Sequence, residues 1–148
     1  VVWLSPHPMD VFREKPLYPI ELKRLDGGAI RTDWWSGKPA VIVVFSSYCP
    51  YCAQSMQVLH RLAKELPVYG IAWRDEPDKI RKYLEKYGDP FRDIGLEQGM
   101  DLAYFWQLDG TPMTLLLDRD QKVVEWKAGL LTEEEIKRIW LPAIALLH

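Results

Sequence analysis

The pattern of apolar and polar residues along the chain predicts two kinds of segment, strands and helices. Residues 40–45 form a continuous apolar, largely β-branched run, which predicts a strand that is covered on both faces of a sheet. Residues 68–73 and 113–117 predict two further strands. Residues 50–65 place apolar side chains at helical spacing, so a helix is expected soon after the first of these strands.

Shorter elements occupy the rest of the chain, and turn or capping residues mark their ends. Residues 20–32 predict a hairpin around a Gly-rich turn, and residues 75–87 predict a helix with an acidic first turn. Residues 118–126 predict a turn followed by a partner strand, and Thr132 is expected to cap the final helix. Two more short elements are expected, a strand at 91–96 and a helix at 99–106.

The order of these elements predicts an α/β protein with a central mixed β-sheet flanked by helices on both faces. An N-terminal β-hairpin precedes a βαβαβ core, and two strands and a helix follow it. The strand and helix at residues 68–87 form an insertion within that core. We expect one domain over residues 20–148, preceded by an irregular, proline-rich N-terminal arm at residues 1–19.

Charge and hydropathy exclude several classes of function. The formal net charge of −2 gives no electrostatic reason to expect a nucleic-acid partner. No apolar run approaches the roughly 18 residues that span a bilayer. The chain begins with Val1 and not with Met, which is compatible with the removal of an export signal or an anchor.

The chain has two cysteines, Cys49 and Cys52, in a CxxC motif between a predicted strand and a predicted helix. A disulfide between them closes too short a loop to stabilise the fold much, so a chemical role is favoured. At the helix start, free N–H groups favour a thiolate on Cys49, and Pro50 suits the first turn. Cys52 would lie one turn behind. This geometry predicts that Cys49 attacks a disulfide and that Cys52 resolves the mixed disulfide.

Two metal-binding uses of CxxC motifs fit the sequence poorly. A structural zinc site needs four ligands, and the chain has no second cysteine pair while its histidines, His7, His60 and His148, are scattered. A c-type haem site needs a histidine directly after the second cysteine, where this chain has Ala53. We therefore expect neither a metal nor a cofactor.

A second motif, Thr111-Pro112, directly precedes the strand predicted at 113–117. Pro112 has two interpretations. It is a residue of a turn that starts the strand, or it is a cis-proline facing the cysteines, with the Thr111 backbone free to bind an extended substrate. Position alone leaves both open.

Taken together, the motifs resemble those of the TlpA/ResA/CcmG (DsbE) family of thioredoxin-like oxidoreductases. The resemblance implies a thioredoxin-like fold and a protein disulfide oxidoreductase, with Cys49 as nucleophile, Cys52 as resolving thiol and Pro112 as the cis-proline. The remaining expected site residues support the active site or bind substrate: Tyr48, Pro50, Tyr51 and Thr111. The segments that carry the resemblance are residues 37–39, 46–52, 68–87, 110–118 and 129–130.

The resemblance also implies a compartment and partners. Members of this family are extracytoplasmic, being exported or anchored, and exchange dithiols for disulfides with protein clients. Many act on the reducing side, including on apocytochrome c in cytochrome c biogenesis, and a membrane electron donor of the CcdA/DsbD type returns the electrons.

Three positions depart from the family pattern. Tyr48 stands where the family usually has Trp, Ser55 where it often has Glu, and Met113 where CcmG members often have an acidic residue. A carboxylate near the resolving thiol commonly assists its proton transfer, so its absence bears on the pKa of Cys52.

Other functions remain as alternatives. The main one is a thioredoxin-like binding or regulatory module with a structural disulfide and no turnover. A peroxiredoxin-like peroxidase would have Thr where this chain has Ser46, together with an Arg partner that is not obvious here. A glutaredoxin shares the Pro-Tyr dipeptide but lacks the insertion at 68–87, so that family is rejected.

Overall fold

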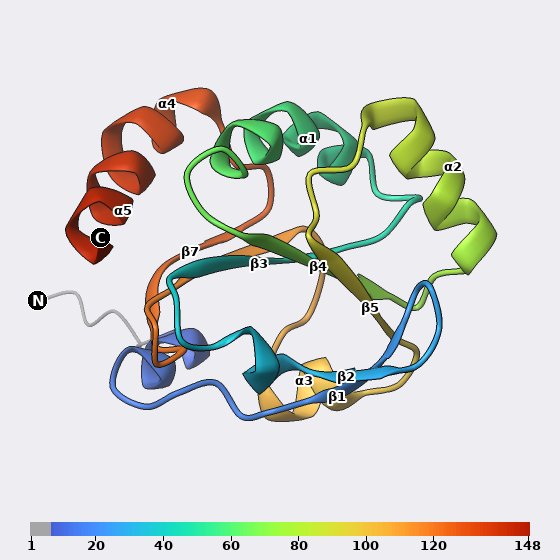
Figure 1. The fold of residues 1–148 in the computed structure, drawn as a ribbon, viewed down its shortest axis with the longest axis horizontal. Coiled ribbons are helices and arrows are strands. Elements are labelled where there is room, and N and C mark those ends of the chain that lie inside the picture. Colours follow the sequence, from blue (N-terminus) through green and yellow to red (C-terminus); the bar gives the residue numbers. More distant parts are fainter. Residues whose placement is uncertain (1–6) are drawn as a thin grey trace, which may run out of the picture.

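The computed structural model describes residues 7–148, whose seven strands form one sheet with helices on both faces (Figure 1). The strands are β1 (Glu21–Arg24), β2 (Ala29–Arg31), β3 (Ala40–Phe45), β4 (Val68–Trp73), β5 (Asp93–Glu97), β6 (Met113–Leu117) and β7 (Val123–Ala128). The α-helices are α1 (Pro50–Leu62), α2 (Pro77–Tyr87), α3 (Asp101–Phe105), α4 (Glu133–Glu135) and α5 (Leu141–Leu147). Two 3-10 helices, η1 (Pro8–Arg13) and η2 (Thr32–Trp35), and a π-helical segment, η3 (Ile136–Trp140), complete the set.

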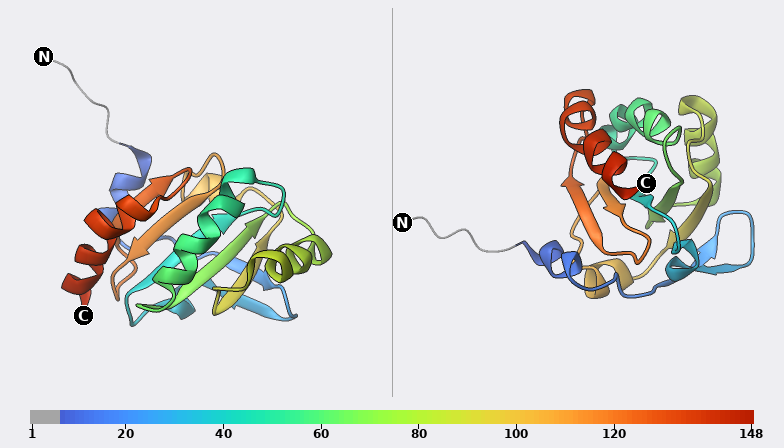
Figure 2. Two further views of the ribbon diagram at one scale, coloured as in Figure 1. Left: turned by 90° about the horizontal axis from the view of Figure 1, so that it is seen from above. Right: turned by 60° about the vertical axis from the view of Figure 1, so that its left-hand side comes forward.

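The sheet is mixed, as predicted, with the strand order β2-β1-β5-β4-β3-β6-β7. Strands β3, β4 and β5 are parallel neighbours, and the other pairs are antiparallel. Helices α1, α2 and the C-terminal helical segment cover one face, while η1 and α3 lie on the other (Figures 1 and 2). This arrangement confirms the predicted thioredoxin-like α/β class, including the N-terminal hairpin and the β4–α2 insertion.

Strand β3 is buried on both faces, which explains its continuous apolar sequence. Successive side chains of a strand point to opposite sides of the sheet. Accordingly Val41, Val43 and Phe45 join the core cluster formed with α1 and α2. Ile42 and Val44 join the second cluster, formed with η1 and α3.

The N-terminal arm expected at residues 1–19 is not irregular throughout. Residues 1–6 lie outside the described part of the chain, but the next residues form helix η1. His7 caps this helix by accepting a hydrogen bond on Nδ1 from the Met9 N–H at 3.0 Å. Met9 and Phe12 are buried against the core. A single short helix with two buried residues has too little periodicity to be recognised in the sequence.

The final helix begins where Thr132 was expected to cap it. The Glu135 N–H donates to Thr132 Oγ1 at 3.2 Å, and the Thr132 N–H donates to the Glu135 carboxylate at 3.1 Å. Such reciprocal bonds form a capping box. Further along, Pro142 lacks an N–H and its ring crowds the preceding turn, which accounts for the wider π-helical turn just before it.

No helix within residues 7–148 is both long and apolar enough to cross a membrane.

The hairpin and strand β5 approach each other closely at Gly95. A Cβ atom added there would lie 2.5 Å from Leu22 Cδ1 and 2.9 Å from Leu22 Cβ. Because real Cβ contacts are not this short, only glycine fits between β1 and β5.

We expect Gly95→Ala to lower the free energy of unfolding by about 1–3 kcal/mol, because Leu22 must move out of a packed core. Urea unfolding of the variant measures this loss. Gly110→Ala is the matched control, since a Cβ there meets no atom within 4 Å. Equal losses in the two variants would contradict the close approach at Gly95.

Candidate active site at the start of helix α1

Cys49 is the N-cap residue of helix α1 and follows the carboxyl end of strand β3. Its Sγ accepts a hydrogen bond from the Cys52 N–H at 3.2 Å, and both cysteines are free thiols. Pro50 is the first helical residue, as expected. The main-chain donor and the positive end of the helix dipole both favour negative charge on this sulfur. Cys49 Sγ therefore lies at the main-chain donors of the helix start.

Cys52 lies one turn further along α1 and is only 2% exposed, against 9% for Cys49. Burial is the main cause that raises the pKa of the Cys52 thiol, and its hydrogen bond with Cys49 adds to this effect. Hydrogen bonds with the Ser46 main chain and the Thr111 side chain act in the opposite direction. Cys52 therefore keeps its proton over a wide pH range, behind the more accessible sulfur.

The Thr111–Pro112 peptide bond is cis, which is the geometry that the second interpretation of Pro112 requires. Thr111 Oγ1 lies 3.4 Å from Ser46 Oγ, which brings the loop before β6 against the loop before α1. The Pro112 carbonyl accepts a hydrogen bond from the Gly129 N–H at 2.8 Å. A pocket of about 210 Å³ adjoins this loop, and Thr111 and Pro112 contribute to its lining.

Asp75 anchors the segment that precedes Cys49, and sequence reasoning missed this role. Its buried carboxylate accepts hydrogen bonds from both the main-chain N–H and the hydroxyl of Ser47. It also accepts the Glu76 N–H at 2.8 Å. The sequence signalled Asp75 only as an acidic residue near the start of a helix. Its position two residues after a buried strand, at the same sheet edge as Ser47, was the available clue.

Tyr48 and Tyr51, two of the expected supporting residues, lie on the surface beside the cysteines and are 66% and 56% exposed. The Tyr48 hydroxyl donates to the Arg74 carbonyl at 3.2 Å, which fixes the ring across the loop that follows β4. Exposed aromatic rings of this size are suited to contact a client protein.

Ser55, which replaces the frequent Glu of the family, has a structural role here. It is buried, and its hydroxyl donates to the Tyr51 carbonyl at 3.0 Å and accepts the Leu131 N–H at 3.4 Å. It thereby joins helix α1 to the loop before the C-terminal helix. Met113 is also buried. Because serine and methionine have no carboxylate, neither position brings one to Cys52. Within residues 7–148, no group of three or more His, Cys, Asp or Glu is arranged to hold a metal ion.

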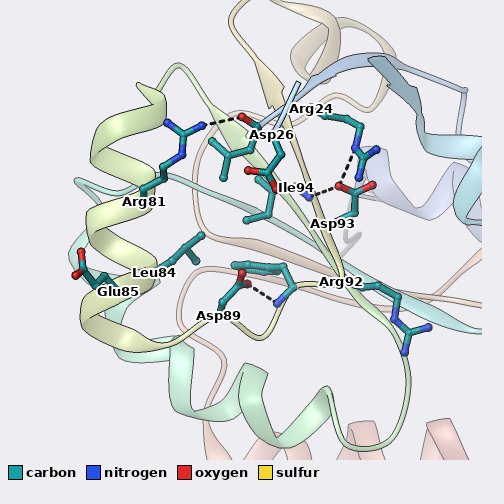
Figure 3. Close-up of a pocket in the computed structure, with 11 residues that line it drawn as sticks. Arg24, Asp26, Arg81, Leu84, Glu85, Asp89, Arg92, Asp93 and Ile94 are labelled. Carbon is teal, nitrogen blue, oxygen red and sulfur yellow. Dashed lines mark hydrogen bonds and ion pairs between the residues drawn. The ribbon is translucent and has the colours of Figure 1, made fainter. Parts of the chain in front are cut away.

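A separate pocket of about 490 Å³ lies between the hairpin, strand β5 and helix α2 (Figure 3). Arg24 pairs there with Asp93 at 3.2 Å, and Arg81 donates to the Leu25 carbonyl at 3.0 Å. These charged groups join the hairpin to β5 and α2, away from the cysteines.

A central parallel strand that leads into a capped CxxC helix, with a cis-proline loop beside it, is the arrangement of thioredoxin-like disulfide oxidoreductases. The comparison with protein families agrees with this class. The chain belongs to the AhpC/TSA family, whose model matches residues 14–139.

Curated relatives narrow the assignment to DsbE-type thiol:disulfide interchange proteins. DsbE of Escherichia coli (strain K12) is 31% identical over 138 residues, covering 85% of this chain and 72% of the relative. A DsbE homolog of Paracoccus denitrificans is 29% identical over 122 residues, covering 81% and 68%. The crystal structure of a thio-disulfide isomerase from Thermus thermophilus superposes with a TM-score of 0.65 at 31% identity, covering 87% of this chain and 94% of that chain. The chain is thus a DsbE-like thiol:disulfide interchange protein.

Burial should make the two cysteines react very differently with alkylating agents. At neutral pH we expect iodoacetamide to modify Cys49 at least about tenfold faster than Cys52, because only a thiolate reacts and Cys52 is buried with a raised pKa. Peptide mass spectrometry of the reduced protein measures both rates. Cys52 should stay unmodified in the Cys49→Ser variant as well. Comparable labelling of the two residues would show that Cys52 is not shielded.

Loss of the Asp75 carboxylate should destabilise the protein. We expect Asp75→Ala to lower the free energy of unfolding by about 1–3 kcal/mol, because the Ser47 N–H loses its acceptor. Asp78→Ala is the control, since its carboxylate is 94% exposed and makes only a surface ion pair with Arg81. The same small loss in both variants, measured by urea unfolding, would exclude an anchoring role for Asp75.

Proposed function

We propose that this protein reduces disulfides of protein clients, with Cys49 as the attacking thiolate and Cys52 as the resolving thiol. The observation that supports this assignment is the position of Cys49 Sγ at the N-terminus of α1, with Cys52 buried one turn behind. Cys49 is the more exposed of the two cysteines, at 9% against 2%. The order of attack follows from that difference in access.

Each step of the reaction conserves electrons and protons. The Cys49 thiolate attacks one sulfur of the client disulfide, and the other client sulfur leaves as a thiolate that takes a proton from water. Cys52 then loses its proton to water and attacks Cys49 Sγ. The second client sulfur leaves, and a Cys49–Cys52 disulfide remains. Two electrons have passed to the client, so an electron donor must reduce the pair again.

The cis-proline loop and the two exposed tyrosines are assigned to client binding. Thr111 lies beside Ser46, so a client segment bound along the Thr111 backbone would run past Cys49. Tyr48 and Tyr51 flank the same sulfur and offer apolar contact area. Pro50 leaves the first helical turn without an N–H that would need a partner.

A reductive direction is supported by the resemblance to the DsbE group, many of whose members act on the reducing side. The potential of the cysteine pair depends on how strongly the reduced form is stabilised, so its measurement tests the direction.

We further propose that the protein works outside the cytoplasm, in cytochrome c biogenesis. Disulfides form and persist in oxidising compartments, which is where a dedicated disulfide reductase has substrates. Membership of the DsbE group supports apocytochrome c as a client and a membrane electron donor of the CcdA/DsbD type as the source of electrons.

The reductive assignment is tested by insulin reduction with dithiothreitol and by the Cys49–Cys52 reduction potential. The wild-type protein should accelerate insulin reduction, and Cys49→Ser should reduce the rate to that of dithiothreitol alone. The potential should lie closer to about −270 mV, typical of thioredoxin, than to about −120 mV, typical of DsbA.

Two results would contradict the proposal. Equal rates with wild-type and Cys49→Ser protein would favour the alternative of a binding module with a structural disulfide. A potential near that of DsbA would assign the protein to the oxidising side.

A further inference from the structure

A row of exposed side chains, joined by direct contacts, begins at the residue before Cys49. The Tyr48 hydroxyl donates to the Arg74 carbonyl at 3.2 Å. The Arg74 guanidinium in turn donates to the sulfur of Met100, a residue that is 58% exposed. The row therefore passes from the loop before α1, over the loop after β4, to the start of helix α3.

Helix α3 continues this row on the other face of the sheet (Figure 1). Tyr104 lies one turn after Met100 and is 76% exposed. Its ring meets the edge of Phe105 with 4.8 Å between centroids, and Phe105 stacks on the exposed Tyr18 at 4.3 Å. We call the six residues together the aromatic strip: Tyr18, Tyr48, Arg74, Met100, Tyr104 and Phe105.

Contacts with groups beneath it hold the aromatic strip in place. The indole N–H of the buried Trp106 donates to the Tyr18 carbonyl at 2.8 Å. The Arg74 N–H donates to the Glu97 carbonyl at 2.8 Å, and the Arg74 guanidinium carbon lies 5.5 Å from the centre of the Trp73 ring. A surface that is already ordered loses little conformational entropy when a partner binds.

The composition of the aromatic strip is typical of a surface that binds protein. Tyrosine, methionine and arginine are enriched in protein interfaces, whereas lysine and glutamate are depleted. Methionine adapts its shape to different partners, and tyrosine offers a large contact area with few rotatable bonds. Contiguous exposed apolar groups of this kind mark interaction sites.

The aromatic strip also carries a positive charge that is not paired within the described chain. None of the ion pairs formed within residues 7–148 involves Arg74, although its side chain is exposed. A planar guanidinium binds carboxylates with good geometry. A carboxylate from a partner would therefore complement this position.

We propose that the aromatic strip binds the client polypeptide beside the disulfide that Cys49 attacks, and that it favours client segments with apolar side chains and an acidic residue. The occupant is the client because the strip reaches Cys49 through Tyr48, so a chain joined to Cys49 has its neighbouring residues within reach of the strip. The acidic residue follows from the unpaired charge of Arg74. This inference rests on the exchange chemistry proposed for Cys49 but not on the direction of electron flow.

The inference is tested with two single-cysteine peptides, each activated as a mixed disulfide with pyridine-2-thiol. One peptide has Phe and Glu residues on both sides of its cysteine, and the other has Gln in place of every Glu. The Cys49 thiolate attacks the peptide sulfur and forms the Cys49–peptide disulfide. Pyridine-2-thiolate leaves with the electron pair of the broken bond and takes a proton from water, giving a thiopyridone whose absorbance is followed by stopped flow. Dithiodipyridine, a neutral disulfide too small to reach α3, measures the intrinsic reactivity of Cys49.

In the Met100→Ser/Tyr104→Ser double variant, the attack on both peptides should be at least about fivefold slower, because two apolar contacts with the client are lost. Serine is a favourable N-cap residue, so the start of α3 should stay intact. The reaction with dithiodipyridine and the melting temperature should match wild type, since both side chains are exposed.

In Arg74→Gln, the attack on the Glu peptide should be about three- to fivefold slower, whereas the attack on the Gln peptide should be nearly unchanged. The difference between the peptides should disappear at high salt, because exposed charges are then screened. Leu146→Ser and Arg92→Gln are the matched controls. Leu146 is exposed on α5, on the opposite face of the sheet from α3, and Arg92 lines the pocket next to the hairpin (Figures 1 and 3). Both controls should react as wild type does.

Three outcomes would overturn the inference. The double variant could attack the peptides as fast as wild type, the control variants or dithiodipyridine could show the same losses, or Arg74→Gln could slow the two peptides equally. Wild-type protein that releases no thiopyridone from the peptides or from dithiodipyridine would instead contradict the exchange chemistry of the cysteines itself.

Discussion

Burial of strand β3 on both faces is the constraint on which the rest of the structure depends. Its side chains alternate between two core clusters, so the strand cannot shift by one residue without exchanging the two sets. The chain therefore leaves the carboxyl end of β3 at a fixed position at the edge of the sheet, where Cys49 caps helix α1. The same sheet edge holds Asp75 after β4, and the antiparallel partner β6 brings the cis-proline loop to it. The redox site is thus a consequence of how one strand is packed.

Local patterns in the sequence predicted most of the fold and the centre of the site. Strands β3, β4 and β6 have the predicted bounds because each is a short apolar run that ends at a polar or turn residue. The CxxC motif and the Thr132 cap are also local, since helix termini depend on a few adjacent residues. The cis bond at Pro112 was one of two open interpretations until the family resemblance favoured it.

The contacts that the sequence did not reveal are those between residues far apart in the chain. The Asp75 carboxylate, after β4, accepts the N–H of Ser47, after β3. The Ser55 hydroxyl, on α1, accepts the N–H of Leu131 in the loop before the C-terminal helix. Neither pairing leaves a pattern in residue spacing.

The central claim is that Cys49 attacks the client and that Cys52 resolves the mixed disulfide. It is tested most directly by trapping in the source cell, with Cys52→Ala and Cys49→Ala variants compared by nonreducing electrophoresis and mass spectrometry. The account predicts that Cys52→Ala accumulates mixed disulfides with client proteins through Cys49, whereas Cys49→Ala accumulates none. Equal trapping through Cys52 in the Cys49→Ala variant, or no trapping in Cys52→Ala, would contradict it.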